Sequence, residues 1–239
     1  MSKNFLLIVP TYNEAENIEL FLDEALSTGI DILVVDDNSP DGTSDLVSNK
    51  IKKNSSIHLL SRSQKDGLGS AYRDGFQWGL DSNYDYFIEM DADFSHRFID
   101  LLQMLEIANK YDLVIGSRYI VGGGSTGWSK SRKLLSRGAN IFARILLRST
   151  IRDLTSGFRI YSRKALNLIN YSTTTTDGYG FQIEMSIRCS SKRLDIFEFP
   201  IIFEERREGE SKMSSEIIFE ALLLILSLSP KRYLGMKIC

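Results

Sequence analysis

The chain has 239 residues, of which 43% are hydrophobic and 25% charged, an ordinary composition for a soluble globular protein. Its formal net charge is −2, so no overall positive field favours nucleic acid, and we expect no nucleic-acid partner. Cys189 and Cys239 are too far apart in sequence to suggest a metal knuckle, and the N-terminal apolar run is too short for a signal peptide. A protein of a reducing, intracellular compartment is therefore expected.

The first half of the chain alternates strand-like and helix-like segments. Residues 5–10, FLLIVP, form a continuous apolar run that is typical of a strand buried on both faces. Residues 13–26 carry apolar side chains at the spacing of one helix face. Asn13 followed by Glu16 predicts a capping box at the start of that helix.

The same alternation continues to residue 119. Further strands are predicted at residues 31–37, 56–60, 84–90 and 112–119, and helices from about residue 43, at 69–80 and at 98–110. Such alternation implies right-handed crossovers and a mostly parallel sheet. We therefore predict an α/β fold, in which ligands bind beyond the carboxyl ends of the strands.

Polar motifs follow four of these strands at the point where each one ends. They are PTYNE after the first strand, DDNSPDG after the second, DADFSH after the fourth and GSRY after the fifth. Turns prefer such residues, so each motif alone is a weak signal. Because all four lie at one edge of the sheet and three carry carboxylates, we expect a charged ligand there.

The second half is less regular and contains two segments with large apolar faces. Residues 130–152 hold seven Lys or Arg residues and no acid, and they predict an amphipathic helix. This helix either meets an anionic membrane surface or ligand, or packs on the core with a solvated basic edge. Residues 196–206 predict a last strand, and residues 216–229 are strongly apolar. The last segment is shorter than the roughly 20 residues that a spanning helix needs, which favours an interfacial or docking helix.

Asp91 and Asp93 stand one residue apart at the end of the fourth predicted strand. Two carboxylates this close raise each other's pKa unless a cation lies between them. Oxygen ligands select Mg²⁺ or Mn²⁺ over zinc, and such a cation stabilises a departing diphosphate as a Lewis acid. The alternative for such a pair, taken alone, is a turn with solvated aspartates.

The glycine-rich segment 65–75, KDGLGSAYRDG, has two interpretations. It can cradle a phosphate at the start of a helix. It can also form a tight strand-to-helix turn whose glycines allow close packing, and this is the interpretation that we favour.

Eight ordered motifs together give the chain a specific resemblance to a known family. They are PTYNEAENI, VVDDNSPDGT, DGLGSAYRDG, MDADFSH, IGSRY, LTSGFRIY, GYGFQIEM and RREGESKM. The chain resembles the dolichol-phosphate (polyprenol-phosphate) mannose synthases, which are inverting enzymes of glycosyltransferase family 2 with the GT-A fold. The resemblance covers residues 5–213. It implies a GT-A domain over residues 1–213 and a short apolar helix within 214–239 that docks on a membrane or a partner.

The resemblance implies a reaction and a set of site residues. The reaction is inverting transfer of mannose from GDP-mannose to dolichyl or another polyprenyl phosphate, with Mg²⁺ or Mn²⁺. The implied nucleotide-sugar-binding residues are Pro10, Tyr12, Glu14, Val35, Asp37, Asp91, Ala92, Asp93, Ser95, Arg118, Arg206 and Lys212. The implied metal ligands are Asp91 and Asp93, and the implied catalytic residues are Asp93, Arg118 and Arg132. The chain departs from many relatives at Ser95, where they have glutamine, and at Arg97-Phe98, where they have proline.

The acceptor determines which side chains the chemistry needs. A phosphate monoester is largely a dianion at neutral pH and needs no general base, whereas a sugar hydroxyl does. Arginine matches phosphate geometry, and the candidates are Arg118, Arg132 and Arg206, with Lys212 as a point charge. For a hydroxyl acceptor, the base candidates are His96, Asp177 and Glu184. Their alternative roles are a hydrogen-bonded turn residue, a helix N-terminal charge and a solvated helix face, respectively.

Some relatives also carry two membrane-spanning helices at the C-terminus, whereas this chain has one short apolar segment before Cys239. We therefore expect peripheral attachment to the cytoplasmic face of a membrane, or attachment through a small membrane-anchoring subunit. The membrane is the endoplasmic reticulum in a eukaryote or the plasma membrane in a prokaryote.

Two other functions remain open at this point. One is a related enzyme that transfers glucose from UDP-glucose, or aminoarabinose, to the same lipid phosphate. The other is a non-catalytic nucleotide-sugar-binding subunit of a membrane complex. A dinucleotide-binding module is disfavoured, because no G-x-G-x-x-G motif follows the first strand.

Overall fold

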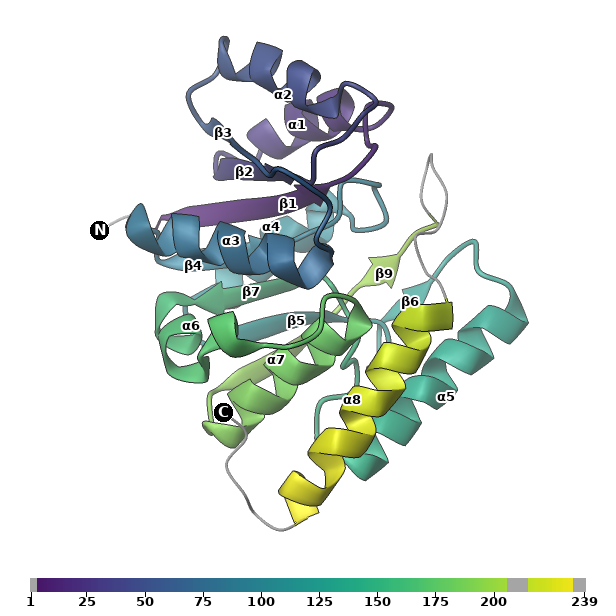
Figure 1. Ribbon diagram of the computed structural model, residues 1–239. Helices are drawn as coiled ribbons and strands as arrows, with labels where there is room; N and C mark the ends of the chain where they lie inside the picture. The colour runs from purple at the N-terminus through teal and green to yellow at the C-terminus, as the bar shows by residue number, and fades with distance from the viewer. Residues whose placement is uncertain (1–3, 206–214, 234–239) are drawn as a thin grey trace.

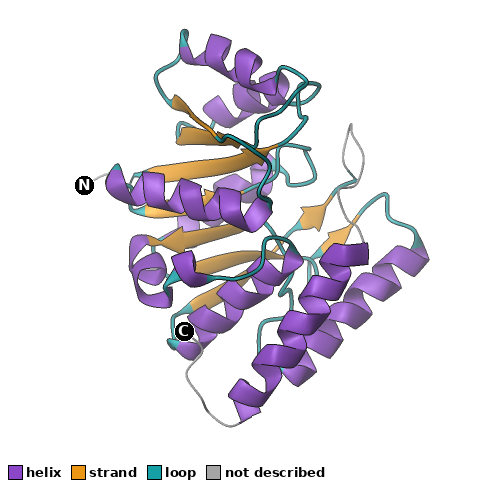
Figure 2. Ribbon diagram, viewed as in Figure 1, coloured by secondary structure: helices purple, strands orange, loops and turns teal. Residues whose placement is uncertain are grey.

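A computed structural model describes residues 4–205 and 215–233. Its centre is a seven-stranded sheet in the order β3-β2-β1-β4-β7-β5-β8, with helices packed on both faces (Figure 1, Figure 2). The strands of this sheet are β1 (Phe5–Thr11), β2 (Asp31–Asp36), β3 (Ile57–Ser61), β4 (Tyr86–Glu89), β5 (Leu113–Ser117), β7 (Arg159–Ser162) and β8 (Ile196–Pro200). A second, parallel pair joins β6 (Gly124–Ser125) to β9 (Ile202–Phe203).

The described helices alternate with the strands in the first half of the chain. They are α1 (Ile18–Leu26), α2 (Thr43–Ile51), α3 (Leu68–Asp81), α4 (Phe98–Ala108), α5 (Lys130–Leu146), α6 (Arg163–Ile169), α7 (Tyr179–Ser191) and α8 (Ser215–Tyr233). The predicted fold, a mostly parallel sheet flanked by helices, is confirmed.

Strand β1 shows how the sheet divides the core into two layers. Successive side chains of a strand point to opposite faces. Leu6 and Ile8 pack in one cluster with residues of α3 and α7, and Leu7 and Val9 pack in the other with residues of α1 and α4. All four side chains are fully buried, which is why the predicted strand reads as a continuous apolar run.

Strand β7 departs from the parallel pattern and has no counterpart among the predicted strands. It pairs antiparallel with β4 on one side and with β5 on the other. Its four residues are all buried, and α6 follows it directly. A strand of four residues without alternating polar and apolar side chains has no hydrophobic pattern by which it can be predicted. Only the folded sheet shows where it pairs.

The predicted capping box at Asn13 is wrong, because α1 begins five residues later at Ile18. Asn13 has a φ angle of 56°, in the left-handed region that asparagine tolerates better than most residues. Its backbone N–H donates to Ser39 Oγ at 3.0 Å, in the loop after β2. The polar residues that resembled a helix cap therefore join two loops at the sheet edge.

Two predicted boundaries in the second half are also corrected. The helix predicted at residues 130–152 is α5, which ends at Leu146, and Arg148 after it has a φ angle of 49°. The strand predicted at residues 196–206 is divided at Ile201 into β8, in the main sheet, and β9, which pairs with β6.

Helices α5 and α8 lie side by side at one end of the sheet (Figure 1). Helix α8 packs on α7 and α5, and Leu224, Ile225 and Leu228 on its inner face belong to the core. Ser229 Oγ donates to the carbonyl oxygen of Leu146, at the end of α5, at 3.1 Å. Among the described helices, none combines the length and the apolar composition that crossing a membrane requires.

Candidate active site

A cleft of about 410 Å³ opens beyond the carboxyl ends of β1, β2, β4 and β5. The four polar motifs that were predicted to meet all contribute to its lining. The predicted site residues that line it are Pro10, Tyr12, Glu14, Asp37, Asp91, Ala92, Asp93, Arg118 and Arg132. Parallel strands bring their carboxyl ends to one edge, so residues far apart in sequence share this cleft.

Two other predicted residues, Val35 and Ser95, do not line the cleft. Val35 is fully buried in the core cluster that includes α3, and a Cβ on Gly75 of α3 would lie 3.4 Å from its Cγ2. Ser95 is also buried and is not among the lining residues. Arg206 and Lys212 lie outside the described residues.

The loops after β1 and β2 are joined by hydrogen bonds to Asp41 and Thr43. The Ala15 N–H donates to Asp41 Oδ2 at 2.9 Å, and the Glu14 N–H donates to Thr43 Oγ1 at 3.0 Å. Burial raises the pKa of Asp41, but hydrogen bonds from Thr43 and Ala15 outweigh it and hold the pKa below its ordinary value. These contacts position Glu14 at the cleft.

Asp37 is held at the cleft by Arg62, which the sequence motifs did not identify. Arg62 Nη1 lies 2.6 Å from Asp37 Oδ1, and its Nε lies 3.0 Å from Asp74 on α3. Burial raises the pKa of Asp37 although Arg62 acts to lower it. Because the guanidinium and both partners lie on different elements, only the fold brings them together.

Asp91 and Asp93 line the cleft just after β4. Asp93 is 7% exposed, and its Oδ1 accepts the Ser95 N–H at 3.0 Å. Phe94 between them and Ser95 has a φ angle of 61°, which makes the tight turn. Gly157 from the segment before β7 approaches closely, since a Cβ there would lie 3.9 Å from Asp91 Oδ2.

This carboxylate pair fits Mg²⁺ or Mn²⁺. Within the described residues, no group of three His, Cys, Asp or Glu side chains forms a closed metal cage. Mg²⁺ is typically held by one or two carboxylates together with phosphate oxygens of the substrate and water. Asp91 and Asp93 supply the protein's share of such a site, and the adjoining cleft leaves room for a diphosphate.

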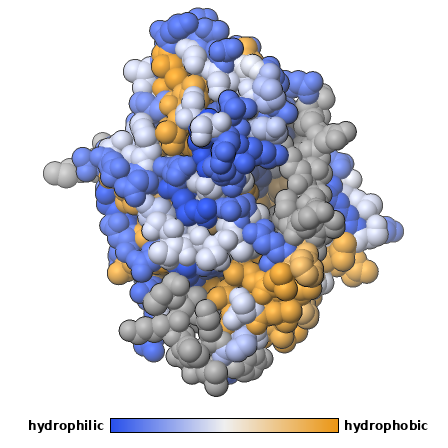
Figure 3. Space-filling model, in the orientation of Figure 1, coloured by the Kyte–Doolittle hydropathy of each residue, from blue (hydrophilic) through white to orange (hydrophobic). Residues whose placement is uncertain are grey.

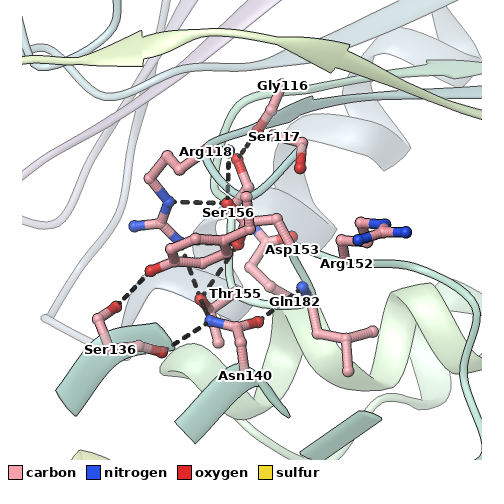
Figure 4. Close-up of polar contacts among 12 residues, drawn as sticks. Gly116, Ser117, Arg118, Ser136, Asn140, Arg152, Asp153, Thr155, Ser156 and Gln182 are labelled. Atoms are coloured by element: carbon pink, nitrogen blue, oxygen red, sulfur yellow. Dashed lines mark hydrogen bonds and ion pairs between the residues drawn. The ribbon is translucent and has the colours of Figure 1, made fainter. Parts of the chain in front are cut away.

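Arg118, which follows β5, is held by a buried carboxylate, that of Asp153 (Figure 4). Its Nε and Nη2 donate to the two oxygens of Asp153 at 2.8 and 2.7 Å, and its backbone N–H donates at 3.0 Å. Burial raises the pKa of Asp153, but Arg118 outweighs it and the pKa lies below its ordinary value. The pair is bidentate, which fixes the plane of the guanidinium.

Further polar contacts surround this pair (Figure 4). Thr155 Oγ1 accepts from Arg118 Nη2 at 2.9 Å and from Asn140 Nδ2, on α5, at 3.0 Å. Glu198 Oε1 on β8 accepts the Asp153 N–H at 2.9 Å. Sequence reasoning missed Asp153 as the partner of Arg118. The signal that could have found it is its position directly before the LTSGFRIY motif.

One wall of the cleft, the arginine wall, consists of Arg118, Trp128, Arg132 and Phe203. The Arg132 guanidinium lies 4.2 Å from the centre of the Trp128 ring, and Arg118 lies 5.6 Å from that of Phe203. Aromatic faces attract guanidinium groups, so these contacts hold both arginine side chains against the wall. The arrangement presents two cations beside the carboxylate pair.

The opposite wall, the α3–α7 wall, consists of Gly67, Leu68, Ala71, Asp177, Gly178, Gln182 and Glu220. A Cβ on Gly69 would lie 2.6 Å from the Thr176 carbonyl oxygen, so the start of α3 packs directly on the segment before α7. This contact supports the close-packing interpretation of the glycine-rich segment. Asp177 pairs with Arg73 at 2.6 Å, and its N–H donates to Glu220 Oε1 on α8 at 3.1 Å.

Two of the three base candidates, His96 and Glu184, are buried. His96 is buried and stacks on Phe158, with ring centres 4.8 Å apart, and its Nδ1 accepts the Asp91 N–H at 3.4 Å. Burial lowers the pKa of His96 to about 4, so the ring is neutral at pH 7 and behaves as a turn residue. Glu184 is neither at the cleft nor solvated, because it is buried in an ion pair with Arg188 at 2.6 Å.

Comparison with known proteins places this cleft in context. Residues 6–169 match the family described as glycosyl transferase family 2. An undecaprenyl-phosphate mannosyltransferase of Micrococcus luteus is 44% identical over 220 residues, which cover 91% of this chain and 90% of that protein. A polyprenol monophosphomannose synthase of Mycolicibacterium smegmatis is 42% identical over 224 residues, covering 92% of this chain and 84% of that protein.

Two solved structures share the fold. A mannosyltransferase from Pyrobaculum calidifontis, in complex with GDP-Man and Mn²⁺, aligns with a TM-score of 0.61 and 16% identity over 98% of this chain and 75% of that one. GalNAc-T7, solved with UDP, GalNAc and Mn²⁺, aligns with a TM-score of 0.57 and 13% identity over 94% of this chain and 48% of that one. At these identities the likeness is one of fold, and it confirms the predicted GT-A architecture.

Proposed function

Because this chain belongs to glycosyl transferase family 2, we propose that it transfers mannose from GDP-mannose to a polyprenyl phosphate such as dolichyl phosphate. The observation that carries this proposal is the cleft, where a carboxylate pair lies beside two arginines. A nucleotide-sugar donor needs the first feature, and a phosphate acceptor needs the second. The names of two relatives, 44% and 42% identical, support the sugar and the lipid phosphate.

The donor would lie across the sheet edge with its diphosphate at the carboxylate pair. Tyr12, Glu14 and Asp37 are on the side of β1 and β2, which suits the nucleoside. Asp91 and Asp93 would hold Mg²⁺ or Mn²⁺ against the diphosphate. When bound, the cation supplies Lewis-acid stabilisation of the departing diphosphate. A likeness in fold to a mannosyltransferase solved with GDP-Man and Mn²⁺ supports this arrangement.

The acceptor phosphate would lie against the arginine wall. Arg132 would hold an anionic oxygen there, because guanidinium groups bind phosphate through paired hydrogen bonds. Arg118, whose Nε and Nη2 are bound to Asp153, would contribute its charge beside it. That oxygen forms the new bond to the anomeric carbon as the bond from this carbon to the donor diphosphate breaks, and GDP leaves. Attack from the face opposite the diphosphate inverts the configuration. No proton needs to be removed, since the phosphate is already largely a dianion.

An assay with radiolabelled donors tests the proposal. The protein, with Mg²⁺ or Mn²⁺, is incubated with a polyprenyl phosphate and with GDP-mannose or UDP-glucose in parallel. A lipid-linked product that forms from GDP-mannose is expected. A product from UDP-glucose alone would instead establish the other donor, and no turnover with either would indicate a non-catalytic subunit.

Replacing Arg132 with alanine is expected to raise the KM for polyprenyl phosphate by roughly 10- to 100-fold, because a hydrogen bond to a charged group contributes about 1.5–3 kcal/mol. The KM for GDP-mannose should change much less. Arg132→Lys should recover part of the loss, since lysine keeps the charge but not the fork geometry. The matched control is Lys133→Ala, which removes an exposed cation from the next position of α5.

The same proposal predicts that no side chain acts as a general base. His96→Gln and Asp177→Asn should each keep the acidic limb of the profile of kcat against pH, at saturating donor and acceptor. Loss of a true base costs roughly 10²–10⁴ in rate. If one variant loses that much and also loses the acidic limb, the acceptor is a hydroxyl and the lipid-phosphate proposal fails.

The outer faces of α5 and α8 are the proposed membrane contact, which we call the α5–α8 face. It consists of Leu134, Leu135, Ile141, Phe142 and Ile145 of α5 with Phe219, Leu222, Leu223 and Leu226 of α8. These side chains are 37–75% exposed, and Figure 3 shows apolar surface gathered over both helices. Large exposed apolar patches mark interaction sites. Arg132 of α5 lines the cleft, so a lipid held on this face would bring its phosphate to the arginine wall.

We therefore propose peripheral attachment to the cytoplasmic face of a membrane, directly or beside a small anchoring subunit. Replacing Arg137, Arg144 and Arg148 with glutamine should weaken binding to anionic liposomes roughly 100-fold, at about 1 kcal/mol per basic residue. Co-sedimentation measures this. Glutamines at the exposed Lys52, Lys53 and Lys110 are the control with the same change in charge. Equal binding of the two triple variants would contradict the proposed orientation.

A further inference from the structure

Several buried polar atoms beneath the α3–α7 wall have no hydrogen-bond partner among the described residues. They include Tyr72 Oη on α3, Glu89 Oε1 on β4 and Gln182 Oε1 on α7. A buried polar atom without a partner costs about 1–3 kcal/mol, so such atoms usually meet a ligand or an ordered water. Gln182 is the member of this group that also lines the cleft.

The side chain of Gln182 is held in one orientation. It is 1% exposed and lies in the first turns of α7. Its Nε2 donates to Glu89 Oε2 at 2.8 Å, across 93 residues of sequence. The amide nitrogen is therefore turned toward β4, and Oε1 is left as a buried acceptor without a partner among the described residues, on a residue that lines the cleft. A side chain fixed in this way loses little entropy when a ligand binds.

The chemistry of the α3–α7 wall suits the sugar of the donor rather than a phosphate. In the described structure this wall contains no Lys or Arg but two carboxylates, Asp177 and Glu220. Asp177 is paired with Arg73, so Glu220 is the carboxylate that would repel an anionic acceptor, which the arginine wall attracts, and both carboxylates accept hydrogen bonds from hydroxyls readily. The proposed function places the nucleoside on the side of β1 and β2, the diphosphate at the carboxylate pair and the acceptor phosphate at the arginine wall. The α3–α7 wall is therefore the one left for the donor sugar.

We propose that Gln182 is a specificity-determining residue that accepts a hydrogen bond from a ring hydroxyl of the donor sugar, with Glu89 as the residue that positions its amide. This inference rests on the proposed function, because only a nucleotide-sugar donor brings a hydroxylated ring to this wall. The inference identifies the side chain that allows the protein to distinguish GDP-mannose from GDP.

The test compares the affinity for GDP-mannose with that for GDP, by isothermal titration calorimetry with Mn²⁺ and without acceptor. In Gln182→Met the Kd for GDP should match that of the wild type, while the ratio of the GDP-mannose affinity to the GDP affinity falls about tenfold or more. Gln103→Met makes the same change at an exposed position of α4 and should leave both affinities unaltered. Unchanged GDP binding also shows that the cleft of the variant is folded.

An unchanged affinity ratio in Gln182→Met would overturn the inference, while lipid-mannose formation by the wild type would show that the proposed function still holds. If the wild type neither binds nor uses GDP-mannose, the proposed function itself fails. If Gln182→Met misfolds and loses GDP binding, the test is made on the wild type instead. Its affinity is then measured for GDP-mannose analogues that each lack one hydroxyl of the sugar. A loss of about tenfold at one position is expected, and equal affinity for all analogues would overturn the inference.

Discussion

Replacing Asp93 with asparagine is expected to lower kcat by about 10³-fold or more. The reason is that a divalent cation contributes several kcal/mol to the stabilisation of the departing diphosphate, and each 1.4 kcal/mol is a factor of about ten. Asparagine keeps the size of the side chain but removes the charge. Asp93 is 7% exposed, and its Oδ1 accepts the Ser95 N–H, so the carboxylate is held in place at the cleft. The measurement is lipid-mannose formation across a titration of Mg²⁺ and of Mn²⁺.

Two comparisons make this result specific to metal binding. Asp195→Asn makes the same chemical change at the exposed residue just before β8 and should leave kcat unaltered. A chelator should abolish the activity of the wild type, and added Mg²⁺ or Mn²⁺ should restore it. Full activity of the wild type in EDTA with metal-free reagents would refute the metal hypothesis.

Arg118→Ala is expected to lower the free energy of unfolding by about 3–5 kcal/mol, independently of its effect on turnover. Asp153 has no exposed surface, and Arg118 has only 8% exposed, so the substitution leaves a buried carboxylate without its cation. Urea denaturation at pH 7 measures the loss. The comparison is Lys50→Ala, which breaks an ion pair with Asp23, itself 59% exposed, and should cost at most about 1 kcal/mol.

The pH dependence of this loss identifies its cause. In the wild type the pKa of Asp153 lies below its ordinary value of 3.8, so the ionised pair contributes stability above that pH and loses it below. In Arg118→Ala burial still raises the pKa of Asp153, and of the causes that lower it the backbone N–H at position 118 and the charge of Arg159 remain, so the carboxyl is protonated at higher pH than in the wild type. The difference in stability between wild type and variant should therefore shrink as the pH is lowered from 7 toward 4. A difference that stays constant over this range would assign the loss to packing.

Much of the fold followed from local patterns in the sequence. Buried parallel strands read as apolar runs, and the predicted strand at residues 31–37 lies within one residue of β2. The motifs after four strands were predicted to meet because parallel strands end at one edge, and Asp37, Asp91 and Arg118 do line one cleft. These predictions succeeded because the pattern of apolar side chains in a strand, and the end at which it stops, can be read from a short segment of sequence.

The family could also be identified from sequence, because eight motifs occur in order along the chain and are recognised without knowing how their side chains pack. The motifs did not predict how each side chain packs. The side chain of Val35 lies in the core, and Glu184, a base candidate for a hydroxyl acceptor, forms a buried ion pair with Arg188. A motif records which residues occur together and not which way each side chain points.

By itself, then, the sequence determined the family, the order of the parallel strands' motifs and the carboxylate pair at the sheet edge. Only the tertiary structure decided that β7 inserts antiparallel, that Asp153 holds Arg118, that Gln182 is turned by Glu89, and that α5 and α8 expose apolar faces beside the cleft. Each of these depends on contacts across 35 or more residues, or on what a neighbouring helix leaves uncovered. Such contacts and such burial are set by packing between elements, which no local period in the chain records.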